Sequence, residues 1–292
     1  MIQLERTQNI RLGILLMIGG TALFTTGEAI VKHLTQDYAV TQIVWARYTF
    51  HALVTLLFFL RGGIARQART RRPWLHVTRS ALMLAATVLF FTALRYLPLA
   101  EAVAINFIMP ALVTAFSIPL LGERVGVRRW LAILVAFAGV LVIIRPGLGV
   151  MHWAAVLPLG TAACYALYQI LTRIAARTDD TNTSLFWTSA FGVVVTSAAV
   201  PFAWSAPDAG GWVLMVALGA VYGVGHWLVI RALELAAASR LSPFLYAQIV
   251  WATLFGLVLF DQVPDGATFV GLTVVTASGL YIWRRETAGR SA

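Results

Sequence analysis

The sequence has little charge. Of its 292 residues, 12% are Asp, Glu, Lys or Arg, whereas 60% are hydrophobic. Soluble domains carry roughly 25% charged residues. A water-exposed surface cannot be built from so few charges, so most of the surface must face something other than water. The composition therefore excludes an ordinary soluble protein.

Cysteine and lysine are each present once. Cys164 lies inside an apolar run, where it reads as a small core residue, and a single cysteine excludes an intrachain disulfide. Lys32 follows Val31, so no Gly-Lys-Ser/Thr phosphate loop exists, and neither His-Glu-x-x-His nor Gly-x-Ser-x-Gly occurs. We therefore expect no catalytic residues, no metal ligands and no cofactor, and the chain is not expected to be an enzyme.

Long apolar runs make up most of the chain. A bilayer core about 30 Å thick needs roughly 20 apolar residues in a helix. The runs predict an all-α polytopic membrane protein with ten transmembrane helices. These are expected at 12–31, 41–60, 75–95, 100–121, 129–144, 153–172, 184–204, 212–232, 241–260 and 267–283. Proline and glycine at several of the breaks end the helices.

The basic residues predict the orientation. The net charge is +10, and all 22 Lys and Arg residues lie on one side of the predicted spans except Lys32, Arg47, Arg95 and Arg145. Cytoplasmic loops carry such an excess of Lys and Arg. Both termini are therefore expected in the cytoplasm. The positive charge is explained by the lipid bilayer as a partner, and no nucleic acid is expected.

The chain repeats itself weakly at a spacing of nearly half its length. Segments 93–101, 121–125 and 139–141 resemble segments 232–240, 259–263 and 279–281 in the same order. This predicts two units, 1–146 and 147–292, with five helices each. Because five is odd, the second unit must enter the membrane from the opposite side, so the repeats are inverted. Inverted repeats commonly place a substrate site between them near the bilayer midplane.

Several motifs carry a family resemblance. Ala93-Leu94-Arg95-Tyr96, Leu121-Gly122-Glu123-Arg124 and Gly139-Val140-Leu141-Val142-Ile143 stand in the first half, and Ser278-Gly279-Leu280-Tyr281 in the second. With them the whole chain resembles the EamA-type members of the drug/metabolite transporter superfamily. The resemblance implies ten helices, inverted repeats and the export or exchange of small metabolites, often amino acids.

Ionisable groups inside membrane spans are functional candidates because they are expensive to bury. We expect Glu28 and Arg47 to form a charged mouth at the outer end of a cavity. A structural interpretation also stands, in which Glu28 pairs with Lys32 one helical turn away, or Arg47 pairs with Glu28 or Asp37.

Polar and aromatic side chains recur within the later spans. A lipid-facing helix has little use for glutamine, so these residues are expected to face the bundle interior, either lining a cavity or holding helices together. The candidate cavity residues are Asn106, Tyr165, Tyr168, Gln169, Tyr222, His226, Trp227, Tyr246 and Gln248. Pro110, Gly219 and Gly223 are candidate kink or hinge positions, with simple close packing as the alternative.

These observations favour a secondary transporter that exports or exchanges small amphipathic metabolites by alternating access. Amino acids are the first substrates expected. Uptake of a nucleoside- or S-adenosylmethionine-like metabolite is the alternative within transport, and a membrane scaffold without transport is the alternative outside it. The expected location is a bacterial inner membrane. The oligomeric state stays open.

Overall fold

The protein is described by a computed structural model. The structure describes residues 10–59, 68–122, 127–144, 152–175, 177–179, 181–235 and 241–288. Within these ranges the regular secondary structure is helical, and no strand occurs. The expected boundary between the two units, at residues 146 and 147, lies outside the described residues.

The helices follow one another with short connections. They are α1 (Ile10–Leu34), α2 (Val40–Phe59), α4 (Pro73–Tyr96), α5 (Leu99–Asn106), α6 (Met109–Leu121), α7 (Val127–Ile144), α8 (Val156–Ala175), α9 (Thr181–Ala199), α10 (Ala209–Leu235), α12 (Ala247–Phe260) and α13 (Gly266–Ala288). Short 3-10 turns, η1 (Trp153–Ala155), η2 (Val200–Ala203) and η3 (Ser242–Tyr246), precede α8, follow α9 and precede α12.

Six of the described helical segments are long and apolar enough to cross a membrane. The chain is thus a polytopic helical membrane protein, as its composition indicates. The total of ten spans and the side on which the termini lie stay predictions.

Two of the expected spans are interrupted. The fourth is divided into α5 and α6, with Phe107 and Ile108 between them and a proline in the first turn of α6. The ninth begins with η3, which also carries a proline in its first turn, before α12 starts at Ala247. Proline lacks a backbone N–H and cannot continue the hydrogen bonding of a preceding helix. Both interruptions therefore have a cause in the local sequence.

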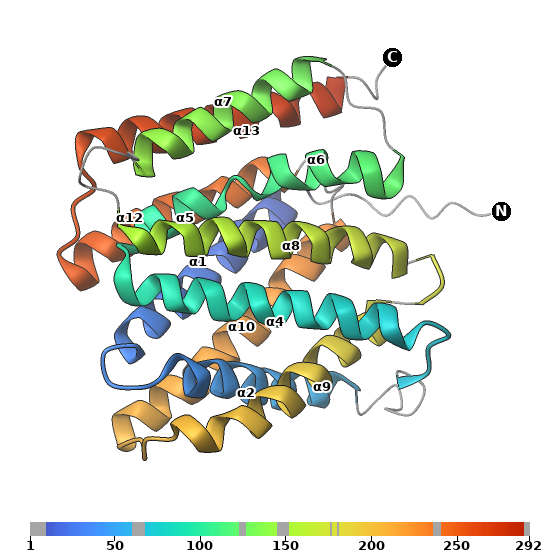
Figure 1. Ribbon diagram of the computed structural model, residues 1–292, viewed down its shortest axis with the longest axis vertical. Helices are drawn as coiled ribbons and strands as arrows, with labels where there is room; N and C mark the ends of the chain where they lie inside the picture. Colours follow the sequence, from blue (N-terminus) through green and yellow to red (C-terminus); the bar gives the residue numbers. More distant parts are fainter. Residues whose placement is uncertain are drawn as a thin grey trace.

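Helix contacts come in matching pairs. The contact of α1 with α10 corresponds to the contact of α4 with α8. In the same way, the contact of α2 with α10 corresponds to that of α9 with α4. Helix α12 packs on α1 as α6 packs on α8, while α7 and α13 pack on each other. Figure 1 shows α7 and α13 side by side at one end of the molecule.

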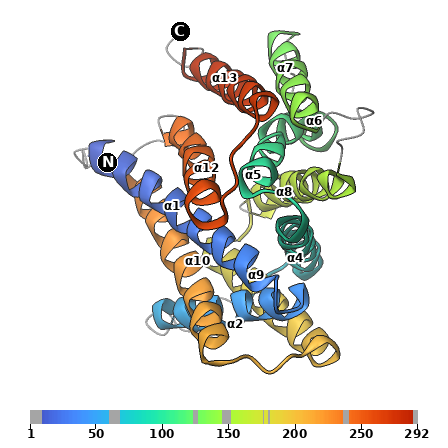
Figure 2. The same ribbon diagram turned by 90° about the vertical axis from the view of Figure 1, so that its left-hand side faces the viewer.

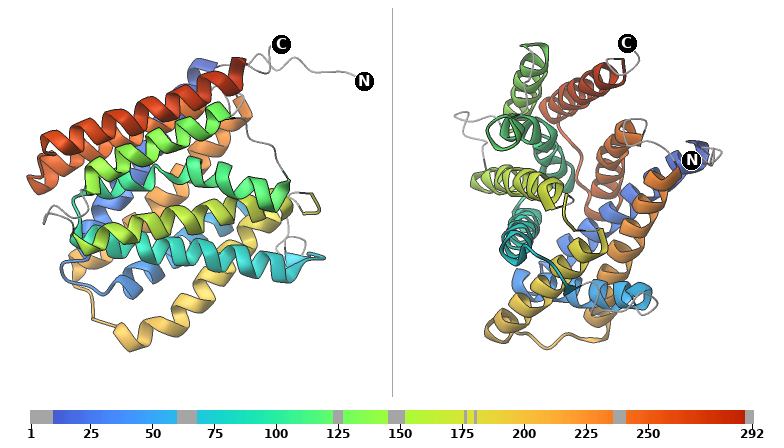
Figure 3. Two further views of the ribbon diagram at one scale, coloured as in Figure 1. Left: turned by 45° about the horizontal axis from the view of Figure 1, so that its top comes forward. Right: turned by 90° about the vertical axis from the view of Figure 1, so that its right-hand side faces the viewer.

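Seen along many of the helices, the bundle has two sides. Helices α1, α10 and α12 lie on one side, α4, α5 and α8 on the other, and α2 and α9 lie across one end (Figure 2). The opposite view in Figure 3 gives the same division. Contacts between α12 and α5 and between α1 and α4 connect the two sides.

Close packing explains the glycines of α10. A Cβ atom at Gly219 would overlap Phe50 and the backbone of His51, and one at Gly223 would lie 2.9 Å from Val54 Cγ1. Helix α10 continues through both positions without interruption. In this structure they let α10 approach α2. A hinge at these positions stays a prediction.

Candidate functional site

A cavity of about 280 Å³ lies between the two sides of the bundle. Residues from α1, α2, α4, α5, α8, α10 and the η3–α12 segment line it. Its aromatic lining consists of Phe24, Phe90, Phe91, Phe107, Tyr165, Tyr222 and His226. Small-molecule sites occupy about 300–1,000 Å³ and combine an apolar lining with a few placed polar groups. The cavity is close to the lower end of that range.

Glu28 supplies a carboxylate to the cavity. Its side chain is 6% exposed, and Oε1 accepts a hydrogen bond of 2.7 Å from Gln248 Nε2. Among the described residues, Oε2 has no hydrogen-bond partner. This oxygen is buried and unsatisfied in the wall of the cavity.

Arg47 supplies a guanidinium group. It is 5% exposed, and Nη1 donates a hydrogen bond of 3.0 Å to Thr87 Oγ1. Its Cζ atom lies 4.5 Å from the ring centre of Tyr222 and 5.8 Å from that of Phe91. Such contacts stabilise a cation away from water. Nε has no hydrogen-bond partner within the described part of the chain.

Asn106 adds an amide at the end of α5. Its Oδ1 is buried, and no described residue hydrogen bonds to it. The interruption between α5 and α6 follows directly. The amide therefore stands at a helix break, where transporters of inverted-repeat type place polar groups.

His226 is held mainly by its own helix. Nδ1 lies 2.8 Å from the carbonyl oxygen of Tyr222, and the ring packs against Phe24 and His51 at 4.9 and 5.2 Å. It lines the cavity while one nitrogen is already engaged.

The structure brings most of the predicted site residues together. Six of the nine candidate cavity residues line the cavity: Asn106, Tyr165, Gln169, Tyr222, His226 and Gln248. Glu28 and Arg47 line it as well. The expectation that these two form an outer mouth needs correction, because both side chains are buried in the cavity wall.

Three candidates lie elsewhere. Trp227 is 43% exposed and not part of the lining, since one residue along a helix from His226 points to another face. Tyr246 stacks on Phe107 with ring centres 5.0 Å apart and is not part of the lining either. Tyr168 accepts a hydrogen bond from Arg79 outside the cavity.

The sequence analysis did not identify the phenylalanines that line the cavity. Phe24, Phe90, Phe91 and Phe107 line the cavity, but phenylalanine also faces lipid freely. No sequence signal separates the two environments. Their identification depends on the packing of helices distant in sequence.

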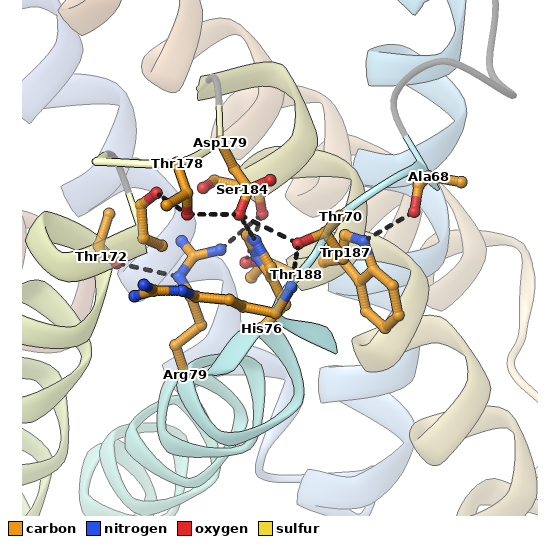
Figure 4. A network of polar contacts seen from close by, with 12 residues as sticks. Ala68, Thr70, His76, Arg79, Thr172, Thr178, Asp179, Ser184, Trp187 and Thr188 are labelled. Carbon is orange, nitrogen blue, oxygen red and sulfur yellow. Dashed lines mark hydrogen bonds and ion pairs between the residues drawn. The ribbon is translucent and has the colours of Figure 1, made fainter. Parts of the chain in front are cut away.

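Arg79 and Asp179 belong to a polar cluster where α4 begins (Figure 4). Arg79 is 1% exposed and donates to Thr172 Oγ1, the Ser184 carbonyl and Tyr168 Oη at 2.8–3.1 Å. Asp179 accepts from Thr70 and His76. The cluster ties α4 to α8 and α9, so Tyr168 has a structural role.

A second, more polar cavity of about 460 Å³ lies where α1, α4 and α12 end. Lys32 lines it and donates hydrogen bonds to the carbonyl oxygens of Leu94 and Leu97, at 3.0 and 2.7 Å. Glu28 and Lys32 lie one helical turn apart on α1 and line different cavities. No ion pair joins them within the described structure.

A polytopic helical bundle around a cavity with aromatic, anionic and cationic lining has the architecture of a membrane transporter. The chain belongs to the EamA-like transporter family, which it matches over residues 11–145 and 152–284. It is accordingly a transporter and not an enzyme.

Several characterised relatives cover nearly the whole chain. A riboflavin transporter of Vibrio cholerae is 25% identical over 94% of each chain. An S-adenosylmethionine uptake transporter of Rickettsia bellii is 21% identical over 88% of each. The pseudopaline exporter CntI of Pseudomonas aeruginosa is 26% identical over 95% of this chain and 98% of its own.

A solved crystal structure has the same fold. It is 19% identical, covers 94% of this chain and 98% of its own, and superimposes with a TM-score of 0.65. Transport of small metabolites is thus common to the named relatives, whereas their substrates differ.

Proposed function

We propose that this protein is a secondary transporter for a small metabolite that combines an aromatic ring with polar groups, and that riboflavin is the first such compound to test. The cavity is the binding site, and the two halves of the chain expose it alternately to the two sides of the membrane.

The lining of the cavity carries this proposal. Aromatic side chains make up about a third of it, with Glu28, Arg47, Asn106, Gln169 and Gln248 as polar groups. A planar ring stacks favourably on such side chains, and the polar groups orient it. Relatives in Vibrio cholerae and Rhizobium johnstonii, 25 and 26% identical over 94% of this chain, are riboflavin transporters.

Alternating access is supported by the pattern of helix contacts. The main contacts between the two halves come in matching pairs, as with α1 on α10 and α4 on α8. Two inverted five-helix repeats, 1–146 and 147–292, with both termini in the cytoplasm, account for this pattern. A bacterial inner membrane is the proposed location, and the relatives named above are bacterial.

Amino acids are the second candidate. An ammonium group would find a carboxylate in Glu28, and a carboxylate would find a guanidinium group in Arg47. Aromatic amino acids share a ring with the first candidate. S-adenosylmethionine joins an amino acid to an aromatic base and belongs in the same panel.

The cavity argues against a scaffold without transport. A scaffold has no need for a carboxylate oxygen and an arginine nitrogen that are buried without partners, as they are in the described structure. Unpaired buried polar groups are costly and are kept where they serve a function.

Transport by proteoliposomes tests the proposal. Purified protein is reconstituted, and the uptake of labelled riboflavin, S-adenosylmethionine and L-tryptophan is compared with that of empty liposomes. Tyr165→Ala, within the cavity, is expected to lower uptake about tenfold by removing a stacking surface. Tyr281→Ala, at an exposed position of α13, is the matched control and should transport like the wild type. Flux no higher than in empty liposomes for all three compounds would refute the proposal.

A further inference from the structure

Two opposite charges in the cavity wall are left without a direct partner of opposite sign. Glu28 and Arg47 are both at least nine-tenths buried. No ion pair joins either of them to another described residue. Each keeps one polar atom free of hydrogen bonds in the described structure, Glu28 Oε2 and Arg47 Nε.

Tyr222 lies beside both groups. Its ring lies against α1, where a methyl group at Gly27 would be 2.6 Å from Tyr222 Cε2. The centre of the same ring is 4.5 Å from Arg47 Cζ. Helix α10, which carries Tyr222, packs on both α1 and α2. The ring thus contacts Arg47 and the turn of α1 that carries Glu28.

One hydrogen bond orients each of the two side chains, Glu28 and Arg47. Gln248 holds Glu28 through Oε1, and Thr87 holds Arg47 through Nη1. Each side chain is anchored at one atom and leaves another to the cavity. Buried charges without partners destabilise a protein, so a purely structural pair would be expected to meet. A ligand that supplies the missing partners removes this penalty when it binds.

We propose that Glu28 and Arg47 determine substrate specificity by hydrogen bonding to one ligand. A hydrogen-bond donor of the ligand meets Glu28 Oε2, an acceptor meets Arg47 Nε, and its ring lies along the aromatic wall. The substrate class is an uncharged or zwitterionic ring compound that carries both donor and acceptor groups. This inference rests on the proposed function and deepens it.

Flavins test this substrate class. Riboflavin carries carbonyl acceptors at the pyrimidine end of its ring system and a chain of hydroxyl groups on a nitrogen of the central ring. Its phosphorylated form, FMN, adds negative charge to that chain, which the carboxylate of Glu28 would repel.

Binding to protein in lipid nanodiscs tests the inference through the fluorescence of riboflavin, of FMN and of lumiflavin, which lacks the chain. Wild type should bind riboflavin about tenfold more tightly than either analogue. Glu28→Gln should weaken riboflavin binding and remove most of the discrimination against FMN. Arg47→Lys should weaken all three flavins by a similar factor, because it removes the Nε donor and keeps the charge. The exposed residues Asp37 and Arg95 provide the controls Asp37→Asn and Arg95→Lys, which should bind like the wild type.

Melting temperatures without ligand separate a specificity role from a structural one. Because Oε2 of Glu28 has no partner, Glu28→Gln should leave the melting temperature unchanged or raise it. A lower melting temperature with unchanged riboflavin-to-FMN discrimination would overturn the inference. So would equal binding of riboflavin, FMN and lumiflavin by the wild type. If no flavin binds, the inference is overturned together with riboflavin as the first substrate, whereas uptake of another compound of the panel by proteoliposomes would keep the transporter proposal.

Discussion

Phe107 and Tyr246 stack with their ring centres 5.0 Å apart and their planes inclined by 28°. Phe107 lies in the interruption between α5 and α6, and Tyr246 ends the 3-10 turn η3 before α12. The two interrupted spans thus meet at their breaks. Phe107 also lines the cavity, so the stack connects the cavity wall to both breaks.

Removing either ring of this stack is expected to change transport more than stability. Stacked pairs contribute about 0.5–1.5 kcal/mol beyond their burial, and both side chains are only half-buried. Phe107→Ala and Tyr246→Ala should lower flux severalfold with a small change in melting temperature. The exposed pair Tyr96 and Trp153, with ring centres 4.9 Å apart, provides matched control variants. Unchanged flux in Phe107→Ala would assign the stack to packing alone.

Asp179→Asn is expected to destabilise the cluster at the start of α4. The carboxylate accepts hydrogen bonds from His76, Thr70 and Thr178 at 3.0–3.1 Å, and His76 is fully buried. Leaving such a partner unpaired costs about 1–3 kcal/mol. Thermal unfolding in detergent measures the loss. The exposed Asp37 gives a control, since Asp37→Asn should unfold like the wild type.

The same carboxylate predicts a dependence of stability on pH. Burial acts to raise the pKa of Asp179, but the hydrogen bonds from His76, Thr70 and Thr178 outweigh it and hold the pKa below its ordinary value of 3.8. A group whose pKa is lower in the folded state stabilises the fold above the unfolded pKa. Its contribution is lost as the pH falls through the folded value. Wild type and Asp179→Asn should therefore converge in melting temperature at acid pH, and a constant difference would contradict this account.

Gly219→Ala is expected to separate α10 from α2. The added methyl group would overlap Phe50 and the backbone of His51, and backbone cannot move aside as a flexible side chain does. Overpacking of this kind costs about 1–3 kcal/mol. Gly210→Ala is the control, because its nearest neighbour would be Asp208 Oδ1 at an ordinary 3.6 Å. Equal unfolding temperatures for the two variants would show that the helices can adjust.

A reporter at the C-terminus tests the orientation and the number of spans together. The Lys and Arg distribution predicts that both termini lie in the cytoplasm, which requires an even number of spans. A C-terminal fusion to green fluorescent protein should fluoresce, and a fusion to alkaline phosphatase should be inactive. Reversed activities would mean that the count of ten is wrong by one.

The sequence by itself determined the class of protein. Low charge and recurring apolar runs leave a helical membrane protein as the solution, because a bilayer demands apolar surface and internally satisfied backbone. Pro110, at the start of α6, marked the interruption of the fourth span, since the chemistry of proline is local. The interruption of the ninth span was not predicted. Glu28, Arg47 and Asn106 stood out because polar groups in apolar runs are rare, and all three line the cavity.

Only the tertiary structure showed the surroundings of residues whose neighbours come from other helices. Tyr168 and Tyr165 lie three residues apart on α8, yet one accepts a hydrogen bond from Arg79 and the other lines the cavity. From the sequence, Glu28 could pair with Lys32 at a helix end or form a cavity mouth with Arg47. In the described structure Tyr222 from α10 lies beside Arg47 and the turn of Glu28, and both groups are buried without an ion pair. Helical periodicity sets the direction of a side chain around its own axis. The neighbour it meets depends on how distant helices pack, and that packing assembles the binding cavity.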